Sequence, residues 1–183
     1  MAARGELEGL ARLARSGSTA AWGKIYEQMA PLVFRLCQRA LLSVEDAEDA
    51  TGEIFLKARL RLQQYDTTRP FAPWLYRIAA NHCWDELRKK RRLAPIDDVD
   101  STLAELEDQS PSPQEAVLAR ESRSRVREAV GGLDDRSRLA IVLRYFADMS
   151  YEEIAQVLDA SSNFVGVLLL RARRTLRKML ESR

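Results

Sequence analysis

The chain has 183 residues, 46% hydrophobic and 31% charged, which is enough for one large or two small domains with hydrophobic cores. The net charge is only +2, and with a single histidine, His82, we expect neither a metal site nor a catalytic triad built on histidine. Cys37 and Cys83 lack metal-ligand spacing, so we expect buried, reduced thiols. No apolar run reaches membrane-spanning length and the N-terminus lacks a signal-peptide core, so we expect a soluble, cytoplasmic protein without membrane insertion.

Taken in chain order, the first predicted elements are three helices. The first starts at Ser18, has apolar residues at intervals of three and four, and is expected to kink at Pro31. The second starts at Ser43 or Asp46, with acidic residues in its first turns, as the helix dipole favours. The third starts near Pro73 and ends at about residue 92.

The charge and proline content change after the third helix. Residues 93–113 contain three prolines, and residues 97–108 hold six acids and no base, which predicts a linker that is extended or folds only on a partner. A helix is expected over residues 114–130, followed by one over 135–147. We therefore expect an all-α protein of two small helical domains, residues 1–92 and 114–183, joined by an acidic, proline-containing linker.

The C-terminal residues predict a helix-turn-helix. Ser150 and Glu153 have the spacing of a capping box that opens a short helix, and a second, basic helix follows after a tight turn. Its core side is expected to be formed by apolar residues at helical spacing, namely Val165, Leu169, Ala172, Leu176 and Leu180.

The third helix separates into two faces when it is wound at 100° per residue. Leu75, Ile78, Ala79 and His82 share one side. The opposite side alternates aromatic, cationic and amide residues, and consists of Trp74, Arg77, Asn81, Trp84, Arg88 and Arg91. Cations neutralise phosphates, aromatic rings stack on unpaired bases and an amide bonds a base edge, so this face suits single-stranded nucleic acid. Packing of the two tryptophans inside the domain is the alternative.

These stretches together resemble the sigma factors of bacterial RNA polymerase, of the extracytoplasmic-function type. The likeness covers nearly the whole chain and is carried by "EDAEDATGEIFLKA", "RPFAPWLYRIAANHCWDELRKKRR", "LDDRSRLAIVLRYFADMSYEEIAQVLDASS" and "RARRTLRK". The resemblance implies a non-enzymatic initiation factor without a cofactor. Its implied partners are core RNA polymerase, promoter DNA in double-stranded and melted form, and an anti-sigma factor.

The resemblance also implies residue roles. An acidic helix that docks on the polymerase clamp would present Asp46, Glu48, Asp49, Glu53 and Phe55. A segment that captures a flipped base of the minus-ten element would use Arg69, Phe71, Trp74, Arg77 and Asn81. The adjacent strand or its phosphates would be followed by Trp84, Arg88, Lys89, Arg91 and Arg92. Contacts to upstream DNA would come from Ser161, Ser162, Asn163, Arg171, Arg173 and Arg174.

The last helix departs from the family pattern in its first half. Phe164, Val167 and Leu170 stand where polar and cationic residues are usual, and apolar groups cannot distinguish bases by paired hydrogen bonds. Three interpretations stay open: phosphate-based DNA binding, an apolar surface for a protein partner, or a domain retained for packing. Gly52 and Arg59 in the docking helix also depart from the pattern.

The predicted function is thus promoter recognition and melting together with core polymerase, with sequence recognition mainly in the first domain. One alternative is a sigma-like interaction protein that binds polymerase or an anti-sigma factor without reading the upstream element. A conventional helix-turn-helix repressor is disfavoured, because no stretch resembles a dimerisation or ligand-binding domain.

Overall fold

The computed structural model describes residues 2–93 and 125–181, and every regular element in these two ranges is helical. The predicted all-α class is thereby confirmed. The elements of the first range are α1 (Ala2–Arg15), α2 (Thr19–Leu41), α3 (Val44–Arg61), the 3-10 turn η1 (Leu62–Gln64) and α4 (Phe71–Leu93). In the second range, a helical stretch over 125–131 precedes α6 (Asp135–Phe146), α7 (Tyr151–Leu158) and α8 (Ser162–Glu181). Apart from Leu93, the predicted linker 93–113 lies outside the described residues.

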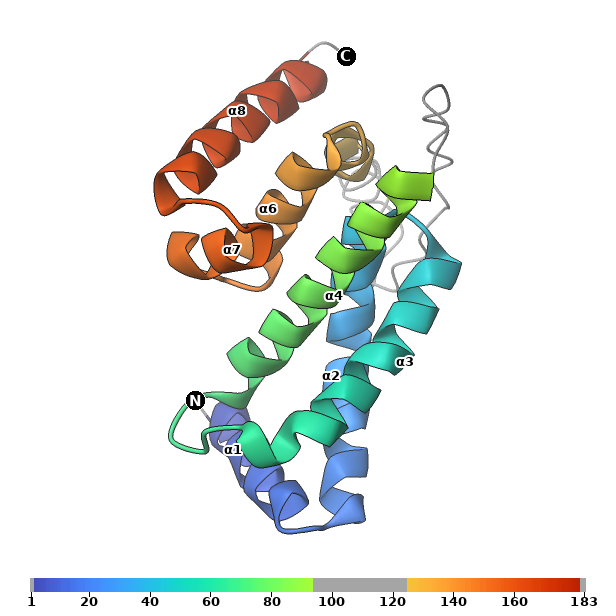
Figure 1. The fold of residues 1–183 in the computed structure, drawn as a ribbon, viewed down its shortest axis with the longest axis vertical. Coiled ribbons are helices and arrows are strands. Elements are labelled where there is room, and N and C mark those ends of the chain that lie inside the picture. Colours follow the sequence, from blue (N-terminus) through green and yellow to red (C-terminus); the bar gives the residue numbers. More distant parts are fainter. Residues whose placement is uncertain (1, 94–124, 182–183) are drawn as a thin grey trace, which may run out of the picture.

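Helix α2 is the centre of the first domain and packs against α1, α3 and α4 (Figure 1). It starts where the Ser18 side chain accepts a hydrogen bond from the Ala21 amide at 3.2 Å, and it is followed by Leu42 in the left-handed conformation. Pro31 lies inside the continuous helix. The predicted apolar stripe is buried over Ile25, Met29, Val33, Leu36, Cys37 and Ala40.

Helix α1 was not predicted from the sequence. Its buried side consists of Leu7, Leu10, Ala11 and Ala14, which pack against α2. These residues repeat at intervals of three and four, which is the signal of an amphipathic helix, although two of the four are alanines and contribute little apolar contrast.

The starts of α3 and α4 follow from their side chains. Ser43 caps α3 by accepting a hydrogen bond from the Asp46 amide at 3.1 Å, which confirms the first of the two predicted starts. Helix α4 begins at Phe71, two residues before the expected position. Pro73 therefore falls in the first turn, where its missing N–H removes no intrahelical bond.

In the second domain, side-chain N-caps define where α6 and α7 begin. Asp134 accepts a hydrogen bond from the Ser137 amide at 3.1 Å and starts α6. The predicted capping box of α7 is present: Ser150 Oγ accepts from the Glu153 amide at 3.2 Å, and the Glu153 carboxylate accepts from the Ser150 amide at 2.8 Å. In α8 the core side is buried at Val165, Leu169 and Ala172, but it weakens toward the C-terminal end, where Leu180 is exposed.

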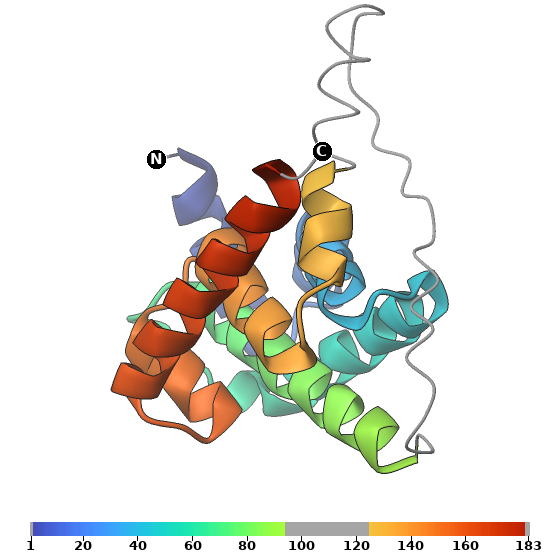
Figure 2. The ribbon, with the colours of Figure 1, turned by 90° about the horizontal axis from the view of Figure 1, so that it is seen from above.

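The two domains touch each other. Helix α6 packs against α2 and α4, and α7 packs against α4. Figure 1 shows α6, α7 and α8 on one side of α4 and α3 on the other, and Figure 2 shows the same helices from above. Apolar side chains of both domains therefore form one continuous core.

His82 and the two cysteines are titratable groups buried among α2, α3 and α4. Both thiols are buried and free, with their sulfur atoms 3.7 Å apart, as expected for reduced thiols. His82 is buried, and its Nδ1 lies 2.7 Å from Lys57 Nζ. Because an ammonium group only donates, Nδ1 must accept, and the imidazole is neutral. Burial lowers the pKa of His82, and the neighbouring Lys57 charge lowers it further.

The buried imidazole predicts a pH-dependent stability. Since the pKa of His82 is lower in the folded than in the unfolded chain, protonation favours unfolding. The free energy of unfolding should therefore fall as the pH drops below about 6.5, the unfolded-state value, toward the lowered folded-state pKa. Urea titrations at several pH values, compared with His82→Gln, measure this. An unchanged slope in His82→Gln would assign the pH dependence to other groups.

Candidate nucleic-acid and polymerase interfaces

The outward face of α4 presents a row of cations next to an amide. Arg77 and Asn81 are exposed one turn apart and Arg88 is exposed two turns further on, while Leu75, Ile78, Ala79 and His82 are buried on the opposite side, as the winding predicted. The last turns of α4 add exposed Lys89, Arg91 and Arg92. Lys89 pairs with Glu86 at 2.6 Å on the surface. Exposed cations therefore occur along about four helical turns of α4.

The loop before α4 is shaped by Asp66. Its carboxylate accepts hydrogen bonds from the Thr68 amide at 2.9 Å and from the Thr68 hydroxyl at 2.7 Å, which forms a tight turn. Arg69 follows this turn with a largely exposed side chain, and its carbonyl accepts a hydrogen bond from the Tyr65 hydroxyl. Arg69 thus lies two residues before the start of α4, with its backbone carbonyl bound by Tyr65.

An aromatic cluster supports the start of α4. The rings of Tyr65, Phe71 and Trp74 lie pairwise 5.2 to 5.3 Å apart between centroids. Phe71 was expected to contact DNA, but its side chain is wholly buried, because the first turn of α4 faces the core at this position. Trp74 is half-buried on top of Phe71 and Tyr65, so it alone of the three combines a fixed orientation with exposed ring surface.

Trp84 is the second correction to the predicted DNA face. Its neighbours on the same stripe, Asn81 and Arg88, are exposed, yet only 7% of Trp84 is accessible. The guanidinium of Arg136, from α6 of the second domain, lies 5.3 Å from the centre of its ring. The sequence of the first domain could not predict this burial, because the covering residue comes from the other domain.

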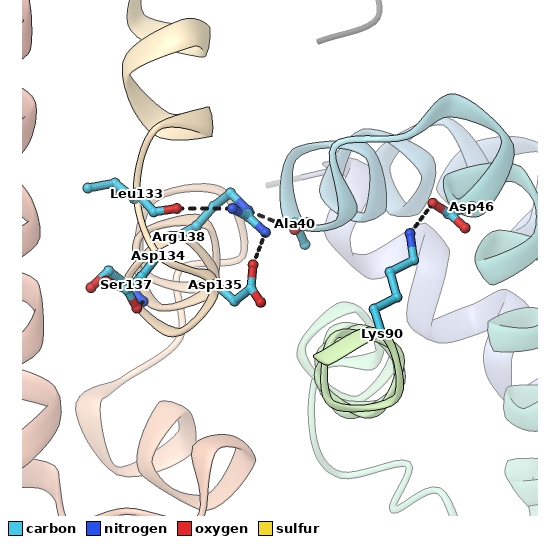
Figure 3. A network of polar contacts seen from close by, with 8 residues as sticks. All are labelled: Ala40, Asp46, Lys90, Leu133, Asp134, Asp135, Ser137 and Arg138. Atoms are coloured by element: carbon cyan, nitrogen blue, oxygen red, sulfur yellow. Dashed lines mark hydrogen bonds and ion pairs between the residues drawn. The ribbon is translucent and has the colours of Figure 1, made fainter. Parts of the chain in front are cut away.

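The acidic residues of α3 lie mostly at the surface, where Glu53 pairs with Lys57 at 3.4 Å. Glu48, Asp49 and Glu53 are exposed, and Asp46 forms an ion pair with Lys90 of α4 (Figure 3). Desolvation alone would raise the pKa of Asp46, but the hydrogen bonds from Lys90 and Ser43 outweigh it, so the pKa is lowered.

Phe55 of α3 is buried, unlike the acidic residues of this helix. Its ring is buried in edge-on contact with Trp22 and Tyr26, with centroids 6.1 and 4.8 Å away, so it supports the helix from inside rather than docking. The unusual Arg59 lies 5.4 Å from the centre of the Trp22 ring and also reaches the Ala14 carbonyl. Gly52 faces open space.

The helix-turn-helix is formed by α7 and α8. Ser161 caps α8 by accepting from the Phe164 amide at 3.1 Å, and Ser162 and Asn163 lie at its start. Arg171, Arg173 and Arg174 are exposed on the basic half. In the first half the apolar residues are also accessible, with exposed fractions of 41% for Phe164, 46% for Val167 and 42% for Leu170.

Within residues 2–93 and 125–181, no three His, Cys, Asp or Glu side chains gather in a way that suits a metal ion. None of the described helices, taken singly, has the length and apolar character of a membrane span; α7 and α8, bent by 97° at their junction, pass that test by length and composition only when counted together.

Sequence-family models and relatives agree with this architecture. Residues 25–93 match the model of sigma-70 region 2, and residues 123–176 match that of sigma-70 region 4. The chain is similar to the extracytoplasmic-function sigma factor SigW of Bacillus subtilis, with 31% identity over 91% of this chain and 92% of the relative. It is also similar to sigma factor CnrH of Cupriavidus metallidurans, with 31% identity over 94% of this chain and 93% of the relative.

The solved structures point the same way. The structure of CnrH in complex with the cytosolic domain of CnrY has a TM-score of 0.65 and 27% identity, and the match covers 97% of this chain and 98% of that one. The sigma factor RpoE of Bartonella quintana, in complex with the anti-sigma factor NepR, shares the fold with a TM-score of 0.65 at 20% identity over 87% of this chain and 96% of that one. The chain therefore belongs to the extracytoplasmic-function sigma factors of the sigma-70 family.

Proposed function

We propose that this chain binds core RNA polymerase, recognises promoter DNA and opens it mainly through the first domain. The observation that carries the proposal is that the packed pair α3 and α4 exposes residues of opposite charge. One side of this pair exposes Arg77, Asn81 and a run of cations for nucleic acid, and α3 exposes an acidic face for a basic protein surface. Catalysis of RNA synthesis belongs to the core enzyme, so the chain acts as a regulator of transcription in the cytoplasm.

Capture of an unstacked base would occur at the start of α4. Trp74 offers a ring face held by Tyr65 and Phe71. Arg77 follows it one turn along α4 and Asn81 two turns along, and Arg69 lies in the loop just before the helix. Stacking and phosphate contacts offset the loss of base pairing, so melting needs no nucleotide hydrolysis.

Upstream DNA binding would rest on phosphate contacts. The exposed arginines of α8 and the polar residues at its N-terminus can hold the backbone, whereas Phe164, Val167 and Leu170 offer no hydrogen-bonding groups to the major groove. We further propose an anti-sigma partner, since RpoE, which shares the fold, is seen in complex with the anti-sigma factor NepR, and CnrH is seen in complex with the cytosolic domain of CnrY. An exposed apolar row on α8 suits such a protein surface.

The function is tested by run-off transcription with core polymerase and a promoter library. Transcripts should depend on the minus-ten sequence and only weakly on the upstream sequence. If the protein co-purifies with polymerase but yields no transcript, the initiation-factor proposal fails and the sigma-like interaction protein is favoured.

The DNA face of α4 is tested by Arg77→Ala and Asn81→Ala. Loss of a phosphate contact at Arg77 should weaken binding to single-stranded promoter DNA regardless of sequence and reduce the salt slope by about one. Loss of a base contact at Asn81 should reduce discrimination by about 1–3 kcal/mol. Arg61→Ala, an exposed arginine at the end of α3, is the matched control in fluorescence anisotropy titrations. Equal effects in all three variants would contradict the assigned face.

The docking face of α3 is tested by the double charge reversal Glu48→Lys, Asp49→Lys. Both side chains are exposed, so folding should be preserved while affinity for core polymerase drops by about tenfold. Glu27→Lys reverses an exposed acid on α2 and serves as control. Affinity can be measured by competition for labelled core enzyme, and equal affinity of the double variant and the control would place docking elsewhere.

A further inference from the structure

The core of the first domain contains a pair of thiols that belongs to neither the docking face of α3 nor the DNA face of α4. Cys37 of α2 and Cys83 of α4 are both 0% exposed, and the Cys83 thiol donates to the Cys37 sulfur across 3.7 Å. They are the two cysteines of the 183-residue chain, so each is the other's sole possible thiol partner within one molecule. Buried cysteines commonly serve as small apolar side chains, but that role does not require two of them in contact.

A metal ion is not the partner that this pair suits. Within residues 2–93 and 125–181, no third His, Cys, Asp or Glu side chain joins the two thiols in a metal-binding group. His82 precedes Cys83 in sequence, but its Nδ1 lies 2.7 Å from Lys57 Nζ and accepts a hydrogen bond there. Structural zinc takes four ligands, whereas two thiols in contact are the reactants of a disulfide.

Helices α2 and α4 pack closely enough to allow a bond between these sulfurs. A disulfide needs the sulfurs at about 2.05 Å and the two Cα atoms within about 7 Å of each other. Ala40 on α2 and Ala79 and Ala80 on α4 are wholly buried one helical turn from the cysteines, and side chains this small let two packed helices lie close together. Rotation of one or both cysteine side chains about the Cα–Cβ bond then brings the sulfurs from 3.7 Å to bonding distance.

The end of α2 that carries Cys37 is also held from the second domain. One turn after Cys37, the Ala40 carbonyl accepts a hydrogen bond at 2.9 Å from Nε of Arg138 in α6, whose side chain is only 5% exposed (Figure 3). The other guanidinium nitrogens of Arg138 donate to the Leu133 carbonyl at 3.1 Å and to the Asp135 carboxylate at 2.6 Å. A bond from Cys37 would therefore join α4 to a helix end that is already fixed in place.

We propose that Cys37 and Cys83 form a modification site, at which a small peroxide closes an intramolecular disulfide that ties α4 to α2. The site is independent of the proposed function, because it requires neither polymerase nor DNA. The covalent ring that it closes runs from residue 37 to residue 83, and it contains α3, η1, the loop before α4 and the start of α4.

Hydrogen peroxide is an oxidant of this class, and the reaction balances without a cofactor. The thiolate of one cysteine attacks a peroxide oxygen, and the O–O bond breaks; the departing hydroxide takes up the proton that the thiol released, which leaves a sulfenic acid and a water molecule. The second sulfur then attacks the sulfenic sulfur, and the S–O bond breaks; the hydroxide leaves with the second thiol proton as another water molecule. The thiols lose two electrons and two protons, and the peroxide is reduced to water.

Burial makes the first step slow and the second step selective. Contact with Cys37 and burial raise the pKa of the Cys83 thiol, so little of the reactive thiolate is present. Peroxide, which is close to water in size, reaches the pair when the packing of α2 and α4 opens locally. Once one cysteine is a sulfenic acid, the other thiol is in contact with it, whereas thiols of other molecules are excluded from the core. The disulfide within the chain therefore forms in preference to a sulfinic acid or a dimer.

The modification is tested by peptide mapping of the folded chain after treatment with hydrogen peroxide, alkylation in denaturant and tryptic digestion without reductant. Peptides are read instead of the whole chain, because methionine oxidation also changes the total mass. Residues 36–39 and 78–88 should appear as one linked peptide, about 2 Da lighter than the two reduced peptides together, and dithiothreitol should separate them. In Cys37→Ala and in Cys83→Ala the remaining cysteine should instead be trapped by dimedone as a sulfenic acid or proceed to the sulfinic acid.

The tie between the helices is tested by urea unfolding of the oxidised and the reduced chain. Because the disulfide joins residues 46 positions apart and restricts the unfolded chain, it should raise the urea midpoint by about 1 M or more. The double variant Cys37→Ala, Cys83→Ala, treated with peroxide in the same way, should keep its midpoint, which controls for methionine oxidation. Circular dichroism checks that the variants are folded.

The modification site would be overturned if both cysteines of the peroxide-treated parent chain were still alkylated, if they were found as sulfinic acids, or if the linked peptides came from dimers on a non-reducing gel. A disulfide within the chain together with an unchanged or lower urea midpoint would overturn the tie between α4 and α2. Neither assay contains polymerase or DNA, so a failure of the proposed function would leave both results readable.

Discussion

The structure depends on one constraint: α4 must pack on opposite sides at once. Leu75, Ile78 and Ala79 are buried against the first domain, and the burial of this stripe fixes the rotation of the helix. This rotation also fixes the directions in which the side chains on the other side of α4 point. Arg77, Asn81 and Arg88 must point outward, and Trp84 must point toward whatever lies beside α4. Packing and recognition are therefore determined by the same helical register.

Interactions that are local in sequence could be predicted from the residues. The all-α class, the Ser43 start of α3, the Ser150–Glu153 capping box and the buried face of α4 all depend on spacings of three or four residues. Helix α1 followed the same rule but was missed, because its buried face is half alanine.

Residues whose surroundings come from elsewhere in the chain could not be placed from sequence. Phe55 and Phe71 share the residue type of a docking or stacking group, but tertiary packing buries both. Trp84 is covered by Arg136 from the second domain, and the partner of Arg138 is a backbone carbonyl, which no residue pattern reveals. The assignment of these residues therefore needed the three-dimensional arrangement of the two domains.

The burial of Arg138 has a consequence for the influence of ionic strength. Its bond to the Ala40 carbonyl joins a charge to a neutral dipole in a region that solvent ions do not reach, so salt screens it weakly. Contacts between exposed arginines and phosphates lose affinity steeply as salt rises, because counterions are no longer released favourably. Ionic strength thus acts on the proposed DNA contacts and hardly on the contact between the domains.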